Sequence, residues 1–174
     1  MQKLFIVLSL AICFISCKKD SDNENNNNQE INSWTFTAGS TVYKGSLFND
    51  PILNTLLQGN DSYTFGMLGG QTTSDGTFNI VLSLLDTTFA AKNYQSGVSG
   101  NDYISAFYYT HGVGGNEIYT SSNYFPGEII NFIIQSYDPS TKILVMTFSG
   151  NAKDASNNIV PISDGKVTCR IKKM

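Results

Sequence analysis

Apolar and polar residues alternate with a period of two over most of the chain after residue 32. Such a period places successive side chains on opposite faces of a strand, so the pattern predicts half-buried β-strands. The clearest run covers residues 77–84, in which Phe78, Ile80, Leu82 and Leu84 alternate with mostly polar neighbours. Further runs cover residues 34–38, 41–44, 62–67, 103–109, 128–137, 142–150, 159–163 and 166–171, and no stretch gives a convincing amphipathic helix.

Turn-forming residues separate these runs. Gly39 allows a tight turn, and Pro139 presets φ at the second position of a four-residue turn over 138–141. Asp164 and Gly165 mark either a two-residue turn or a bulge. The spacing predicts one all-β domain over residues 33–174, an antiparallel β-sandwich of about nine or ten strands, with a lipocalin-like β-barrel as the alternative.

The first sixteen residues follow the layout of a secretory signal peptide. Lys3 provides the positive charge, residues 4–15 are uncharged, and the small Ser16 comes directly before Cys17. A permanent membrane helix needs about 20 apolar residues, so this run is too short to span a bilayer. An ordinary signal peptide with an incidental Cys17 is one interpretation.

The junction from Ser16 and Cys17 into Lys18, Lys19 and Asp20 resembles the processing site of small bacterial lipoproteins of the Bacteroidota type, although Phe14 replaces their more common leucine. The resemblance implies cleavage between Ser16 and Cys17 and attachment of acyl chains such as palmitate to Cys17. It also implies an anchor in the outer membrane, on the periplasmic face or at the cell surface. Several acyl chains together would hold the protein firmly, because each buried methylene contributes about 0.8 kcal/mol.

Four short segments of the domain, residues 34–36, 92–94, 147–150 and 164–167, also resemble the uncharacterised β-rich domains of such lipoproteins. This resemblance implies a fold without an activity.

Residues 17–32 form the expected link between the anchor and the domain. The stretch is polar apart from Ile31, so it predicts a flexible tether with an r.m.s. span of roughly 20 Å. The charged residues after Cys17 resemble signals that send some lipoproteins to the cell surface. A solvated spacer without such a signal is the alternative.

Charge and cysteine content exclude several classes of function. Loss of residues 1–16 removes one basic residue and no acidic one, so the net charge goes from −3 to −4 and predicts no nucleic-acid binding. Cys13 leaves with the signal and Cys17 is the acylation site, so Cys169 is left without a disulfide partner. Its alternating neighbours predict that Cys169 is a buried small hydrophobe.

The sequence gives few candidates for catalysis or metal binding. His111 is the only histidine, it lies in a glycine-rich segment, and no nucleophile elbow accompanies it. A zinc site needs three or four nitrogen or sulfur ligands, and two aspartates paired as in a glycosidase cannot be identified from sequence. We therefore expect no enzyme activity, with a hydrolase as the alternative. We also expect no cofactor, with calcium held by loop oxygens as the one metal alternative.

Aromatic residues are the one compositional excess, with nine tyrosines in the chain. Parity places Tyr108 on the face opposite to Phe107 and Tyr109, and Tyr119 and Tyr124 fall in predicted loops. These three tyrosines, Tyr108, Tyr119 and Tyr124, are the candidate platform for a glycan ligand. Aromatic packing in the core is the alternative explanation for the excess.

The barrel alternative carries its own ligand hypothesis. Trp34 in the first strand and Arg170 in the last are similar to the packed tryptophan and arginine of lipocalins, and would imply a cavity for a small ligand. The sequence as a whole predicts a lipid-anchored, non-enzymatic binding or accessory protein of the envelope. An envelope protein or a glycan is its expected partner.

Overall fold

The computed structural model describes residues 30–48, 55–58, 63–71, 74–84, 93–95, 103–113, 115–122 and 128–173. The signal segment, Ser16, Cys17 and most of the expected tether therefore lie outside the described residues. Within the described ranges there is no helix long and apolar enough to cross a membrane.

The described residues contain twelve strands and belong to one continuous hydrogen-bonded sheet. The strands are β1 (Ser33–Ala38), β2 (Thr41–Leu47), β3 (Thr55–Gln58), β4 (Tyr63–Gly70), β5 (Gly76–Leu84), β6 (Asn93–Gln95), β7 (Tyr103–His111), β8 (Glu117–Ser122), β9 (Ile130–Asp138), β10 (Ile143–Asp154), β11 (Ile159–Arg170) and β12 (Lys172–Lys173).

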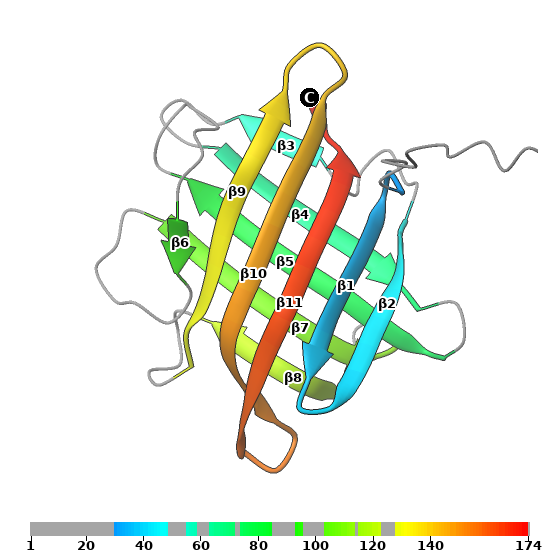
Figure 1. The fold of residues 1–174 in the computed structure, drawn as a ribbon, viewed down its shortest axis with the longest axis vertical. Coiled ribbons are helices and arrows are strands. Elements are labelled where there is room, and N and C mark those ends of the chain that lie inside the picture. The colour runs from blue at the N-terminus through cyan, green and yellow to red at the C-terminus, as the bar shows by residue number, and fades with distance from the viewer. Residues whose placement is uncertain are drawn as a thin grey trace, which may run out of the picture.

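Eight of these strands close into a ring in the order β11, β1, β2, β4, β5, β7, β8 and β10, with β10 pairing back to β11. All pairings in the ring are antiparallel, and β9, β6, β3 and β12 add to it from outside. Figure 1 shows β9, β10, β11, β1 and β2 crossing in front of β3, β4, β5, β7 and β8. The all-β prediction is confirmed, and the closed ring fits the barrel alternative, with its strands arranged in two layers (Figure 1).

Two corners close the ring, and each depends on only two residue pairs. At the glycine corner, β2 pairs with β4 through Ser46 with Gly70 and Leu47 with Gly69. At the charged corner, β8 pairs with β10 through Thr120 with Lys153 and Tyr119 with Asp154. Most strand pairings inside the two layers are longer than these two contacts, so the corners decide whether the ring is closed.

The predicted alternation is confirmed along the strands that form the core. In β1, Trp34 and Phe36 are buried while Thr35 and Thr37 are only partly covered. The Trp34 ring stacks on Phe78 of the opposite layer, with centroids 4.7 Å apart and planes within 5°. Burial of such aromatic side chains is the main source of the domain's stability.

The turns agree with the sequence. Gly39 has φ of 59° in the β1–β2 hairpin, and the predicted hairpin through Pro139 joins β9 to β10. Asp164, with φ of 52°, lies inside β11, where the register against β10 and β1 shifts. Of the two alternatives at Asp164 and Gly165, the bulge is therefore correct.

Candidate functional site

The barrel interior is occupied by aromatic side chains. Phe36, Phe78, Phe107 and Phe148 are all buried, and the Phe107 and Phe148 rings have centroids 5.6 Å apart. Trp34 is buried among them, whereas Arg170 is exposed on the outer side of β11. These two side chains therefore do not form the lipocalin-like packing, and the space at this level holds the protein's own rings.

Three tyrosines, Tyr43, Tyr109 and Tyr119, form a tyrosine cluster beside this core. Their rings lie 4.9 to 6.2 Å apart, and the hydroxyls of Tyr43 and Tyr119 share a hydrogen bond of 3.2 Å. Burial, followed by the contact with Tyr43, raises the pKa of Tyr119 to about 12. Burial also raises the pKa of Tyr109. The hydroxyls of Tyr109 and Tyr119 are therefore neutral hydrogen-bonding groups near neutral pH.

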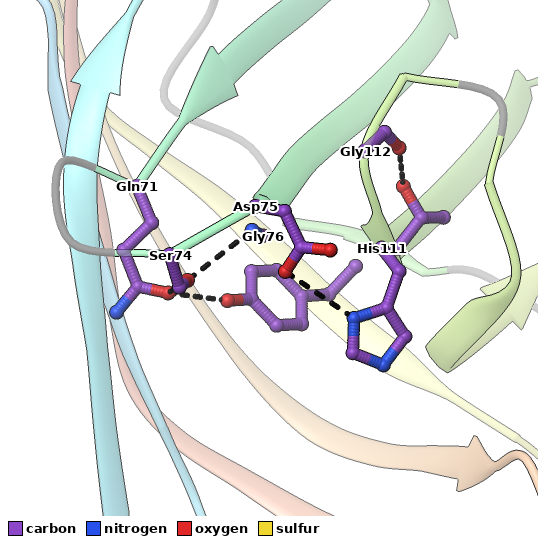
Figure 2. A network of polar contacts seen from close by, with 8 residues as sticks. Gln71, Ser74, Asp75, Gly76, His111 and Gly112 are labelled. Atoms are coloured by element: carbon purple, nitrogen blue, oxygen red, sulfur yellow. Dashed lines mark hydrogen bonds and ion pairs between the residues drawn. The ribbon is translucent and has the colours of Figure 1, made fainter.

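A polar network that includes Gln71, Ser74, Asp75 and His111 lies beside this cluster (Figure 2), and Tyr109 is bonded to it. The Tyr109 hydroxyl donates to Gln71 Oε1 at 2.6 Å, and the Ser74 hydroxyl donates to the same oxygen at 2.7 Å. Beside it, His111 Nδ1 lies 3.4 Å from Asp75 Oδ1, with both side chains more than half exposed. The turn is held by backbone contacts, including a bond of 2.6 Å from Gly112 N to Asp75 O.

The network lacks the geometry of a hydrolytic triad. Ser74 Oγ donates to Gln71 and accepts from Gly76 N at 3.2 Å, while His111 contacts Asp75. A triad histidine must instead accept the proton of the nucleophile. Within the described ranges, no group of three or more His, Cys, Asp or Glu side chains is placed to hold a metal ion. The described residues thus give no evidence of a catalytic function.

The candidate tyrosine platform is divided between two faces of the sheet. Tyr109 is opposite Tyr119 in the β7–β8 register, and Tyr108 is opposite Thr120. Tyr119 therefore points inward to the tyrosine cluster, whereas Tyr108 lies half-buried on the outer face. Tyr108 and Tyr119 therefore do not share one surface, and Tyr124 lies outside the described residues.

The outer face of β11, β1 and β2 carries a groove of about 390 Å³, which we call the basic groove. Its lining consists mainly of polar side chains from three adjacent strands and the segment before them: Glu30, Ser33, Trp34, Thr35, Lys44, Gly45, Ser46, Lys166 and Thr168. The groove is open to solvent and borders the point where the chain enters β1.

Two lysines dominate the chemistry of the basic groove. Lys44 on β2 and Lys166 on β11 are both directly opposite Thr35 of β1, so they flank it on the same face. Because neighbouring strands are about 4.8 Å apart, their backbones are separated by roughly 10 Å. Both side chains are exposed, and neither forms an ion pair with a described residue. Two ammonium groups at this spacing favour an anionic partner.

The charged corner contains a different kind of polar group. Glu128 is fully buried, and its carboxylate contacts the ammonium of Lys153, whose side chain is 30% exposed. Neither carboxylate oxygen accepts a well-oriented hydrogen bond from a described residue, so the ion pair is its main compensation. The Ser121 hydroxyl donates to the Glu128 carbonyl at 3.3 Å and holds the segment against β8. This pair is structural support for the corner.

Sequence reasoning missed both the groove and the buried pair. The groove could have been found, because Lys166, Thr168 and Arg170 alternate with the apolar Val167 and Cys169 and must share one face of a strand. The prediction for Cys169 is confirmed, since the thiol is fully buried and its burial raises the pKa to about 12.

Comparisons of the chain with protein-family models, with curated proteins and with solved structures find no match.

Proposed function

We propose that this protein is a lipid-anchored, non-enzymatic envelope protein that binds an anionic partner through the outer surface of its barrel. The observation that carries the proposal is the pair of exposed lysines, Lys44 and Lys166, which flank Thr35 without acidic partners among the described residues. The packed core supports the same proposal, because the described buried side chains fill the interior and leave the outer face for binding.

The proposed anchor is a set of acyl chains on Cys17 in the outer membrane, facing the periplasm or the cell surface. Support comes from the sequence around Ser16 and Cys17. The test is to grow cells with labelled palmitate and to follow detergent partitioning of the protein. We expect the label and the membrane fraction in the wild type, and the loss of both in Cys17→Ala. A labelled Cys17→Ala protein would contradict this anchor.

Binding is tested by a thermal-shift screen with acidic glycans, neutral glycans, phospholipids and calcium. A ligand at about 100 times its Kd stabilises the folded state by about 2.7 kcal/mol, which gives a clear rise in Tm. We expect anionic compounds to raise Tm in the wild type and to lose that effect in Lys44→Gln/Lys166→Gln. An equal shift in both proteins would place the binding elsewhere.

A second candidate function is recognition of a glycan or small ligand, favoured by Tyr108 on the outer face of β7. Tyr108 lies between Asn79 of β5 and Thr120 of β8, so an aromatic surface is flanked by hydrogen-bonding groups. A neutral glycan whose effect on Tm is lost in Tyr108→Ala but kept in Lys44→Gln/Lys166→Gln would support this function.

A further inference from the structure

The basic groove lies at the place where the chain enters the domain. Glu30 and Ser33 belong to its lining, and the Ser33 hydroxyl donates to the Glu30 carbonyl at 2.5 Å. Asn32, between them, holds both sides of the entry: its Oδ1 accepts from Arg170 N at 3.0 Å, and its carbonyl accepts from Leu47 N at 2.7 Å. Any segment that leads to the domain from Cys17 therefore meets it beside this groove.

The length of that segment limits how far the groove can be from a membrane. Fifteen residues separate Cys17 from Ser33. A fully extended chain of that length reaches about 50 Å, and a coil has an r.m.s. span of only roughly 20 Å. If Cys17 carries the anchor, as proposed above, the groove cannot move farther than about 50 Å from the headgroups.

The charge of this face is opposite to that of a phospholipid surface. Lys44 and Lys166 lie in the groove, and Arg170 extends the same outer face along β11. Glu30 is the one acidic side chain of the groove lining. The next acidic residue along β11 is Asp164, which accepts a hydrogen bond from Ser163 at 2.9 Å. The chain as a whole carries a net charge of −3, so the positive face is a local feature.

We propose that the basic groove docks on the anionic phosphate headgroups of the membrane that holds the anchor, so that the β11–β1–β2 face lies against the bilayer. This proposal rests on the anchor proposed for Cys17. Basic side chains near an anionic surface each strengthen binding about fivefold, and this attraction falls off within a Debye length. In the docked state the opposite layer, β4, β5, β7 and β8, faces away from the membrane and carries Tyr108.

The test uses the full chain, purified from membranes and reconstituted into vesicles of phosphatidylcholine with or without phosphatidylglycerol. An amine-reactive reagent labels exposed lysines, and mass spectrometry of peptides measures each site. We expect labelling of Lys44 and Lys166 to fall several-fold when phosphatidylglycerol is present and to recover in high salt. Lys153, on β10 at the charged corner, is the internal control and should not change.

Two variants with the same change in net charge show whether the groove itself is responsible. Lys44→Gln/Lys166→Gln should weaken docking roughly 25-fold. Ala155→Glu/Ser156→Glu, in the exposed β10–β11 turn, should have little effect. Protection of Arg170 from an arginine-specific reagent reports docking in both variants, and circular dichroism confirms that each is folded.

The docking proposal would be overturned if Lys44 and Lys166 were labelled to the same extent with and without phosphatidylglycerol. This holds whether the labelling is high or low in both kinds of vesicle. Failure of the anchor is a separate result, since the protein would then not enter phosphatidylcholine vesicles at all. In that case cosedimentation with phosphatidylglycerol vesicles still tests the groove, with wild type compared with Lys44→Gln/Lys166→Gln.

Discussion

The two corners of the barrel achieve the same closure by opposite means. At the glycine corner, glycines occupy positions where a side chain would not fit: a Cβ on Gly45 would lie 2.1 Å from Gly70 O and 2.7 Å from Trp34 Cζ2. At the charged corner, a carboxylate is fully buried against the ammonium of Lys153. The first depends on close approach of backbone and indole, and the second on pairing of charge. Mutations should therefore affect the two corners by different rules.

The largest effect should come from separating the charges. Lys153→Met leaves the Glu128 carboxylate buried without a cation, and loss of one partner of a buried pair costs roughly 3 kcal/mol or more. The partial exposure of Lys153 places the expected loss at the lower end of that range. Urea denaturation followed by circular dichroism measures the change in the free energy of unfolding.

The matched control is the double variant Glu128→Leu/Lys153→Met, which removes both charges. Replacing a buried ion pair by apolar side chains is often neutral, so this protein should stay within about 1 kcal/mol of the wild type. If the double variant were as unstable as Lys153→Met, the corner would depend on shape, and its contrast with the glycine corner would disappear.

A single methyl group should be enough to disturb the glycine corner. Gly45→Ala forces Gly70 or Trp34 to move, and overpacking of this kind costs about 2 kcal/mol. Gly66→Ala, in the neighbouring strand β4, meets no atom closer than 4.0 Å and should be neutral or stabilising by about 0.5 kcal/mol. Trp34 is the only tryptophan, so a shift of its fluorescence reports the change directly. Equal stability of the two variants would contradict the close-approach argument.

Tyr43→Phe removes the hydroxyl bond between β2, from the glycine corner, and β8, from the charged corner. A bond of this kind contributes about 1 kcal/mol. The pKa of Tyr119 should fall from about 12 but stay above 10, because burial is its larger cause. Since folding raises this pKa, the contribution is complete below pH 10 and is lost as the pH rises to about 12. A tyrosinate absorbance titration that is unchanged in Tyr43→Phe would disprove the coupling.

The smallest effect should come from Asp138, in the β9–β10 turn away from both corners. Hydrogen bonds from Ser140 and Thr141 lower its pKa to about 2. Folding lowers this pKa, so the contribution is complete above about pH 4 and is lost as the pH falls to about 2. Thermal melts across this range should show a smaller loss in Asp138→Asn than in the wild type. A parallel loss in both proteins would show that the turn does not depend on this carboxylate.

The strands were predictable from sequence, whereas the corners were not. Alternation identifies Phe78, Ile80 and Leu82 as one face of a strand whatever its partners are, because parity is local. The β2–β4 and β8–β10 contacts contain only two pairs each, which is too few to leave a periodic signal. Glu128 precedes a strand and looks like an exposed terminal residue, since burial of a carboxylate depends on a lysine 25 positions later.

The position of β1 has a mechanical consequence. A pull on the chain ahead of Glu30 reaches the barrel at Ser33, and β1 is held on both sides, by β2 and by β11. Asn32 adds bonds to both neighbours at the point where the force enters. The pulling force is thus shared by the hydrogen bonds of the β1–β2 and β1–β11 pairings. Trp34 must also leave the core before β1 can move along its neighbours. A domain joined to its support through β1 would resist extraction better than one joined through an edge strand such as β6.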